Sequence, residues 1–390
     1  MKRLTLLASL TILAGLLAGC GEGFPDEEMH LGLDDKVRPF AILVEPPEAA
    51  PGDSVRITLL ARAPHPSALD ISWQVALDFD RGLYEVDGVE RNLRPLAAPE
   101  PVHDADGFLS QSFTWVVPDS ASLLSSALPE VIDDPALAGI GTLLPGLGAG
   151  PTWRKDELDA WLKAQDPGTL AAMDPVARAA AWGLADRFAC AVRFRATLRA
   201  AGSDDVVDVT RNLTIRHTGR LEGPNTNRNT FVISLEVIGV ARRDASPSDL
   251  ADPDLASARW VLVDGGGHPL RDRVDVPLDP DWTYFARADF AAQPYTSPWD
   301  PTLVIEELGS FRWYYHRQDA PTSDHAFLLT DEGDDAEMWN LDELVRLAPD
   351  GPGSTFRLLL VARDTRREWT SFHAAPGAGV AEGVIAFMAP

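Results

Sequence analysis

Cysteine is scarce in this sequence, because Cys20 and Cys190 are the only two thiols among 390 residues. Two cysteines form at most one disulfide. The chain is therefore not a small scaffold held by several disulfides, and its stability must come from buried apolar side chains. Lysine is almost as rare after position 19, where only Lys36, Lys155 and Lys163 occur. We attribute this shortage to the codon usage of a GC-rich genome and give it no functional weight.

Positive charge is scarce as a whole. The sequence has 34 Lys and Arg residues against 59 Asp and Glu residues, which gives a formal net charge of −25 at pH 7. This excess of negative charge excludes nucleic acid as a partner and excludes electrostatic adhesion to anionic lipid. Its main physical consequence is solubility.

Motifs of the common enzyme classes are missing from the sequence. The chain has no His-Glu-x-x-His zinc motif, no Gly-x-Ser-x-Gly nucleophile elbow, no phosphate-binding loop and no dinucleotide fingerprint. Its eight histidines are scattered, with no pair at helical spacing. We therefore assign no catalytic residue and expect that the protein is not an enzyme.

Only the N-terminus carries a long apolar run, which covers residues 4–17 and follows two basic residues. The run is too short to span a bilayer comfortably, and with its basic start it predicts a secretory signal over residues 1–19. The run ends in Leu17, Ala18, Gly19 and Cys20. This segment resembles the lipobox of bacterial lipoproteins, and the alternative is an ordinary secretory signal that happens to carry a cysteine.

The lipoprotein resemblance implies cleavage before Cys20 and acylation of that cysteine, which would attach the protein to a membrane by lipid. In such proteins an Asp directly after the cysteine usually signals inner-membrane retention, so Gly21 favours the outer membrane. The leaflet and the exposed face stay open. Residues 20–36 are polar, acidic and without periodicity, which predicts a flexible tether.

After the tether, the sequence changes to short runs of alternating apolar and polar residues separated by Pro, Gly and Asp. This pattern is typical of an all-β sandwich or barrel. One such run places Val55, Ile57 and Leu59 on the same face of a strand. The next run, residues 70–77, points Trp73 inward by the same rule.

The alternation stops over about residues 120–187, which we predict to be a helical insertion. Thr152 is placed to cap a helix that ends at residues 166–168, and Asp174 is placed to cap a second helix. The apolar stretch 137–147 has no clear period. Two alternatives stay open for it, packing on the sandwich or exposure as an adhesive patch.

The polar, Gly/Pro/Asn-rich segment 218–229 predicts a linker between a first domain, residues 37–217, and a second domain, residues 230–390. In the second domain, the Asp-Gly-Gly-Gly sequence at 264–267 predicts a hairpin turn between the strands on either side. A short helix is predicted over about residues 340–348.

Both predicted domains contain a strand with an inward tryptophan, Trp73 or Trp313, and a long strand near the end. This arrangement resembles the immunoglobulin-like superfold, in which a core tryptophan packs between two sheets. Cys190 would face inward on the penultimate strand of the first domain. The predicted fold class is mainly β, with two immunoglobulin-like antiparallel β-sandwich domains and a helical insertion in the first. Cadherin-like and PKD-like sandwiches remain alternatives.

One acidic cluster is a candidate metal site. Closely spaced carboxylates are the ligands that calcium needs, but this cluster lacks the spacing of an EF-hand. We favour a solvated acidic loop and no cofactor, and keep as the alternative a calcium site formed by Asp331, Asp334, Asp335 and Glu337.

Glu306 and Glu307 precede Trp313 and Tyr315, and carboxylates beside aromatic rings are typical of sugar sites. Strand alternation instead puts Trp313 and Tyr315 inside, which indicates core aromatics next to two loop carboxylates. We interpret Cys190 as a packing residue, because an inward thiol without a neighbouring base is inert.

These features predict a lipid-anchored protein of the cell envelope with a non-catalytic role in binding, adhesion or scaffolding. Its expected partners are the membrane, through Cys20, and an unidentified envelope protein or glycan. The alternative function is an envelope hydrolase that acts on glycan or peptide through carboxylates that the sequence does not pair. Within the protein, the helical insertion is the segment that we expect to meet a partner.

Overall fold

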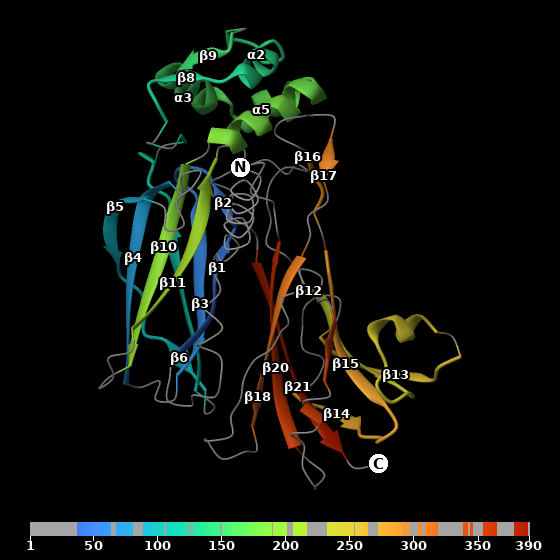
Figure 1. Ribbon diagram of the computed structural model, residues 1–390. Coiled ribbons are helices and arrows are strands. Elements are labelled where there is room, and N and C mark those ends of the chain that lie inside the picture. The colour runs from blue at the N-terminus through green and yellow to red at the C-terminus, as the bar shows by residue number, and fades with distance from the viewer. Residues whose placement is uncertain are drawn as a thin grey trace, which may run out of the picture.

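The structure is a computed structural model (Figure 1). It describes residues 37–63, 68–80, 89–104, 107–121, 123–124, 126, 128–148, 150–188, 190–200, 206–216, 232–252, 254–263, 272–291, 293–296, 303–305, 309–318, 338–341, 344–345, 354–364 and 378–388. Among these residues, no helix combines the length and the hydropathy needed to cross a membrane.

Several predicted features lie outside the described residues. They are the signal peptide 1–19, the tether 20–36, the linker 218–229, the lipobox residues Leu17, Ala18, Gly19 and Cys20, the pair Glu306 and Glu307, and the acidic residues Asp331, Asp334, Asp335 and Glu337. They stay predictions.

The first half of the chain forms two sheets that share one buried core, which we call the first sheet pair. One sheet has the order β1 (Arg38–Glu45), β3 (Ser54–Arg62), β7 (Phe108–Val116) and β6 (Val102–His103). The other has the order β2 (Glu48–Ala49), β11 (Val206–Ile215), β10 (Cys190–Ala200), β4 (Leu69–Asp80) and β5 (Val89–Leu96). Neighbouring strands are antiparallel, except that the short β2 runs parallel to β11.

The second half forms a second sheet pair around its own core. One sheet has the order β13 (Ser257–Val263), β12 (Val232–Val240), β15 (Thr283–Phe290) and β19 (Met338–Asn340). The other has the order β14 (Val274–Pro277), β21 (Ala378–Met388), β20 (Ser354–Asp364) and β18 (Gly309–Arg317). The remaining elements are the 3-10 helix η4 (Pro247–Ala251) and a ribbon of β16 (Tyr295–Thr296) and β17 (Val304–Ile305).

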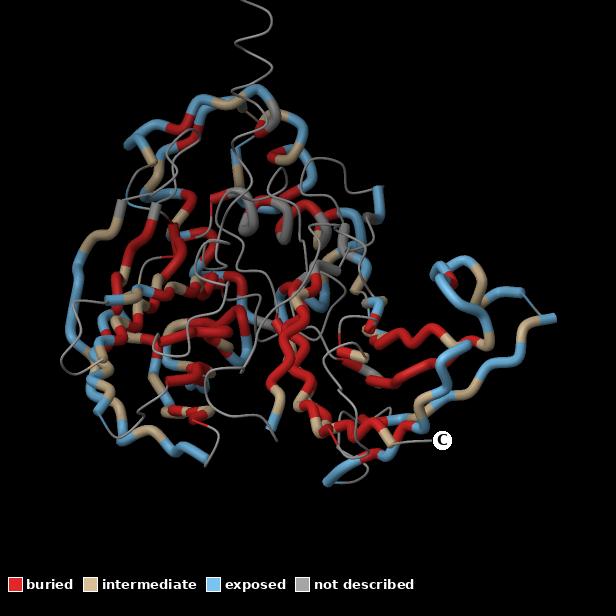
Figure 2. Tube along the Cα trace, turned by 60° about the horizontal axis from the view of Figure 1, so that its bottom comes forward, coloured by how far each residue is buried: buried red, intermediate tan, exposed pale blue. Residues whose placement is uncertain are grey.

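The two sheet pairs share a connection pattern. The run β1-β3-β7 corresponds to β12-β15-β19, and the run β2-β11-β10-β4 corresponds to β14-β21-β20-β18. In each pair a short strand, β2 or β14, lies parallel to the last strand. Trp73 on β4 and Trp313 on β18 occupy corresponding strands, and both are buried as the alternation predicted. Figure 2 shows the buried positions running along the strands of both sheet pairs.

The prediction of a hairpin turn at residues 264–267 is wrong. The two strands that flank this segment lie in different sheets, since β13 pairs with β12 and β14 pairs with β21. The physical reason is burial. Val274 and Val276 on β14 are buried in the second core, on the sheet that faces the sheet of β13. A hairpin with β13 would move both side chains into the other sheet. Of the short helix predicted over 340–348, the structure describes Leu344 and Val345 as helical, and Leu344 is fully buried.

The insertion between β7 and β10 contains α2 (Pro135–Gly141), α3 (Lys155–Ala164), α4 (Pro167–Ala172), α5 (Pro175–Phe188) and a ribbon of β8 (Val131–Asp133) and β9 (Thr152–Arg154). Figure 1 places it at one end of the first sheet pair. Thr152 does not cap a helix, because it pairs with Asp133 in the ribbon, and α3 begins three residues later. α3 ends at Ala164, close to the predicted end at residues 166–168, but Asp166 also caps the additional helix α4, which was not predicted.

The two sheet pairs contact each other. The contact has an apolar cluster made of Phe40, Ala41, Tyr314, Leu359 and Val361, which come from β1, β18 and β20. The ring centroids of Phe40 and Tyr314 lie 4.9 Å apart in an edge-to-face arrangement. Trp313 and Tyr315 are buried in the second core, as alternation predicted, but Tyr314 on the opposite face of β18 is buried too.

A polar contact continues this interface. The Arg357 guanidinium on β20 lies 4.0 Å from the centroid of the Phe108 ring on β7, and it also forms an ion pair with Asp104. On its own sheet, Arg357 donates through Nε to Glu382 at 2.6 Å. The His316 ring packs edge-on against Phe108, with centroids 5.4 Å apart.

Candidate interaction site

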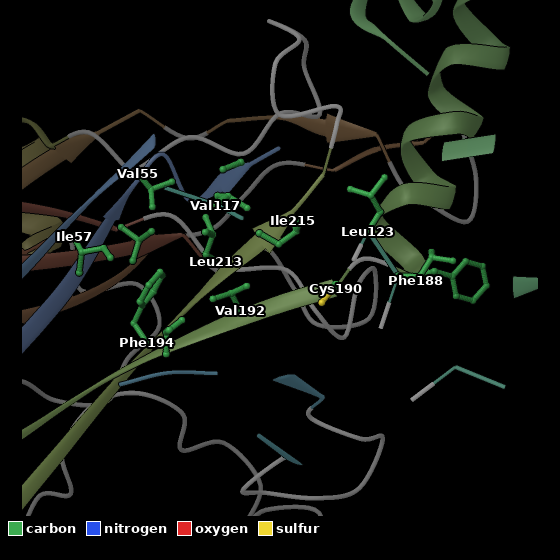
Figure 3. Close-up of a cluster of buried hydrophobic side chains, with 14 of the residues drawn as sticks. Val55, Ile57, Val117, Leu123, Phe188, Cys190, Val192, Phe194, Leu213 and Ile215 are labelled. Carbon is green, nitrogen blue, oxygen red and sulfur yellow. The ribbon is translucent and has the colours of Figure 1, made fainter. Parts of the chain in front are cut away.

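The insertion is joined to the first sheet pair through a continuous buried core. Figure 3 shows Leu123 and Phe188, from the two ends of the insertion, close to Cys190 at the start of β10. The Cys190 backbone N–H donates to the Leu123 carbonyl at 3.0 Å. All three residues belong to the same buried cluster as Trp73 and Phe194 of the sheets. The insertion is therefore a cap on one end of the sheet pair.

Each of the helices α2 to α5 contributes a leucine to the interior of the cap. Leu137, Leu158, Leu170 and Leu184 are all fully buried, and each comes from a different helix, α2 to α5. A short helix is marginal in water when isolated, so the burial of these side chains supplies most of the stability of helices of this length. The cap and the sheets thus depend on each other for a solvent-free core.

Two tryptophans fix the loop that follows α2. Trp153 donates its indole N–H to the Gly148 carbonyl at 2.9 Å, and Trp161 donates to the Pro145 carbonyl at 3.0 Å. Both rings are buried, so each N–H has the partner that a buried indole requires. These bonds hold the loop closed over the cap.

The apolar stretch 137–147 therefore agrees with both of the alternatives that the sequence left open. Most of it packs in the core, and part of it is exposed. Leu137 and Leu144 are buried in the common core, whereas Leu143 is 39% exposed. The ribbon adds Val131, which is 54% exposed, and α5 adds Val176, which is 46% exposed. The outer surface of the cap thus presents several apolar side chains.

Acidic side chains start two of the helices. Asp166 accepts a hydrogen bond from the Thr169 backbone N–H at 3.0 Å, and this bond lowers the pKa of the Asp166 carboxyl. Asp174 accepts from the Val176 backbone N–H at 2.9 Å at the start of α5, which agrees with its predicted capping role. Caps of this kind satisfy backbone donors that the first helical turn leaves without partners.

A polar cluster lies where the cap meets the sheets. The Asp78 carboxylate on β4 accepts a hydrogen bond from the Ser126 hydroxyl, and its Oδ1 lies 3.7 Å from the Cys190 sulfur. A guanidinium nitrogen of Arg91 on β5 lies 3.7 Å from Asp78 Oδ2. Lys155 of α3 donates to the Ser126 carbonyl at 3.2 Å. The cluster ties two strands, the start of the insertion and α3 to one another.

The chemistry of this cluster argues against a nucleophilic thiol. Burial, and next the charge of Asp78, raise the pKa of the Cys190 thiol far above its usual range. Only a thiolate is a good nucleophile, so a thiol that stays protonated at neutral pH is inert. The expectation that Cys190 is buried is confirmed. The role of Asp78 was missed, because its Asp-x-Asp-x-Gly surroundings in the sequence resemble a turn.

Metal ligands do not gather in the part of the chain that the structure describes. No group of three or more His, Cys, Asp or Glu side chains there is arranged to hold an ion. The calcium prediction for residues 331–337 concerns side chains outside that part, and it stays a prediction. Compared with protein-family models and with curated protein sequences, the chain matches none.

Proposed function

We propose that the protein is a lipid-anchored binding or scaffolding protein of the cell envelope that presents its helical cap to a partner. The observation that carries the proposal is the cap itself. A connection between two strands in a compact domain is usually only a few residues long, and binding residues concentrate on connecting segments that a rigid scaffold positions. Here the connection between β7 and β10 contains four helices and a ribbon, and it leaves apolar side chains on its outer surface.

The strand order supports two immunoglobulin-like domains. In that fold one sheet has the order A-B-E-D and the other contains C, F and G. The order β1-β3-β7-β6 agrees with the first sheet, and the order β4-β10-β11 agrees with the second. Trp73 and Trp313 then both lie on strand C, the position of the core tryptophan in this fold. In this scheme the cap is an insertion between strands E and F.

Membrane attachment is proposed from the sequence alone. The segment Leu17, Ala18, Gly19 and Cys20 carries the lipobox resemblance, and Gly21 favours the outer membrane. Cys20→Ser should abolish the incorporation of labelled fatty acid and release the protein into the soluble fraction. A Cys20→Ser protein that still pellets with membranes and resists carbonate would show that a different anchor holds the protein.

The binding role is tested by placing a photocrosslinking amino acid at single positions in cells. Substitution at Leu143 or Val176 on the cap should give an adduct with a partner. Substitution at Leu93 should give none, because Leu93 is 50% exposed but lies on β5, outside the cap.

A matched pair of charge substitutions completes the test. Leu143→Asp should abolish the adduct formed from position 176, because a carboxylate would have to be desolvated in the interface. Leu93→Asp introduces the same change at a position of similar exposure and should leave that adduct intact. Equal adducts from all three positions, or an adduct at 176 that survives Leu143→Asp, would show that the cap is not the binding surface.

A further inference from the structure

Two half-buried tryptophans lie next to each other in the second sheet pair. Trp260 is on β13, and Trp282 directly precedes β15. Gly239 lies on β12, the strand between them, and a Cβ atom at this glycine would be 2.7 Å from Trp282 Cε3 and 3.1 Å from Trp260 Cζ3. Both indoles therefore pack on the strand because Gly239 has no side chain. We call Trp260 and Trp282 the tryptophan pair.

The tryptophan pair turns its N–H groups away from the strand. The atoms that face Gly239 belong to the six-membered rings, on the side of each indole that lies away from its nitrogen. Among the described residues, neither indole N–H donates a hydrogen bond, and neither is one of the buried polar atoms without a partner. Both donors are therefore open to solvent. Trp153 and Trp161 of the cap differ, since each donates its N–H to a backbone carbonyl.

A closely bonded turn holds Trp282 in place. The Trp282 backbone N–H donates to the Asp279 carbonyl at 3.1 Å, and the Asp281 backbone N–H donates to the Asp279 carboxylate at 2.9 Å. The Tyr284 hydroxyl accepts from the Asp279 backbone N–H at 2.8 Å and donates to the Pro277 carbonyl at 2.7 Å. Because the turn is fixed before a ligand arrives, binding at Trp282 loses less conformational entropy.

Hydrogen-bond acceptors lie beside the tryptophan pair. Asp281 directly precedes Trp282, and its side chain is 75% exposed. Its neighbour in the turn, Asp279, is exposed as well. β13 is an edge strand of its sheet, and Figure 1 places this edge on the side of the second sheet pair that lies away from the first. A ligand can therefore reach the site from solvent.

These groups match the chemistry of a pyranose ring. A sugar with equatorial hydroxyl groups has flat C–H faces that pack on an aromatic ring, and hydroxyl groups around its rim. Indole N–H groups donate to such hydroxyls, and carboxylates accept from them. An apolar peptide or a lipid chain would instead cover the two N–H donors and leave them without partners.

We propose that the tryptophan pair binds a glycan of β-1,4-linked pyranoses with equatorial hydroxyl groups. A β-1,4 linkage keeps successive rings in an extended ribbon, so that neighbouring rings can pack on neighbouring indoles. The carboxylates of the turn would accept hydrogen bonds from the hydroxyl groups at the rim. The site lies on the second sheet pair, so it is separate from the cap.

The test is a titration of the Cys20→Ser protein, with an isotope label on its indole nitrogens, followed by NMR. The probes are chitohexaose, a β-1,4-linked oligomer of N-acetylglucosamine, and cellohexaose, the corresponding oligomer of glucose. Binding should move two indole N–H signals, which Trp260→Phe and Trp282→Phe identify by removing one signal each. Each of these changes should also weaken binding about tenfold, because it takes away a donor and part of the stacking surface.

Trp115→Phe is the matched control, since Trp115 is also half-buried but lies on β7 of the first sheet pair. This change should leave the affinity at the parent value. Isomaltohexaose, whose α-1,6 linkages do not form an extended ribbon, is the control ligand and should bind at least tenfold more weakly. If a phenylalanine change unfolds the second sheet pair, Asp281→Ala alters only an exposed side chain and should still weaken binding several-fold.

Three outcomes would overturn the proposal. The first is that neither β-1,4-linked probe binds at about 10 mM, which is already a weak affinity for a specific site. The second is that binding moves only the indole signals of other tryptophans. The third is that the affinity survives the change at Trp260 and the change at Trp282. None of these results bears on the cap, which the crosslinks from positions 143 and 176 test separately.

Discussion

Replacing Leu158 by alanine tests whether the cap and the first sheet pair unfold as one unit. Leu158 lies on α3, is fully buried, and belongs to the cluster that also contains Trp73 and Phe194 of the sheets. A buried Leu→Ala change costs about 2–5 kcal/mol, since it loses transfer free energy and leaves a cavity. At about 3 kcal/mol, with 1.4 kcal/mol for each factor of ten, the unfolded population should rise roughly 100-fold.

The assay uses Cys190 as a reporter of the sheets. In the Cys20→Ser protein Cys190 is the only thiol, and its side chain is fully buried at the start of β10. Labelling of this thiol across a denaturant series therefore measures the opening of β10 where it meets the cap, whereas far-ultraviolet circular dichroism follows the helices. Leu158→Ala should shift both curves together to lower denaturant.

Leu143→Ala is the matched control, because it makes the same change in the same insertion at a side chain that is 39% exposed. Its effect should stay within about 0.5 kcal/mol, as for most surface substitutions. If Leu158→Ala shifts the helical signal but leaves the Cys190 labelling curve at the parent position, the cap folds separately. The buried core that the cap shares with the sheets would then not make the two parts unfold together.

Strands that have one face in a core were predictable from the sequence. The period-2 pattern places Val55, Ile57 and Leu59 on one face of β3, and all three are fully buried. The same rule placed Trp73 and Trp313 inside. A strand with one buried face must repeat its apolar residues every second position, so the pattern reports the burial directly.

Contacts made by the second face of a strand were not predictable in this way. Tyr314 lies between the core residues Trp313 and Tyr315, so alternation places it on the opposite face of β18, where the other sheet pair covers it. A local pattern contains no information about which distant surface packs on that face. The same limit explains the error at residues 264–267, because turn residues specify a reversal of the chain but not the strand that will pair.

The candidate site shows a further limit of prediction, because one short sequence can fit two different local structures. An Asp-Pro-Gly sequence fits both the end of one helix and the start of the next, and Asp166 serves as a start. Thr152 is a common capping residue but also favours strands, and pairing with Asp133 decides for the strand. In both cases a tertiary or cross-strand partner, absent from the local sequence, selects between the alternatives.

Two further predictions concern ionisable groups. Because the pKa of the Cys190 thiol is raised in the folded protein, only the unfolded state loses this proton as the pH rises above about 8.5. The free energy of unfolding should therefore fall by up to about 1.4 kcal/mol per pH unit above that value, and Cys190→Ala should remove this part of the slope. The last prediction concerns the Arg357–Asp104 ion pair, which joins the two sheet pairs, with side chains 15% and 40% exposed. Because Asp104 is well solvated, a double-mutant cycle with Arg357→Met and Asp104→Asn should give a coupling free energy of only about 0.5–1 kcal/mol, which salt should reduce. Methionine retains much of the apolar stem that packs on Phe108, so the cycle isolates the charge. A coupling free energy of zero at low salt would mean that this ion pair contributes nothing to holding the sheet pairs together.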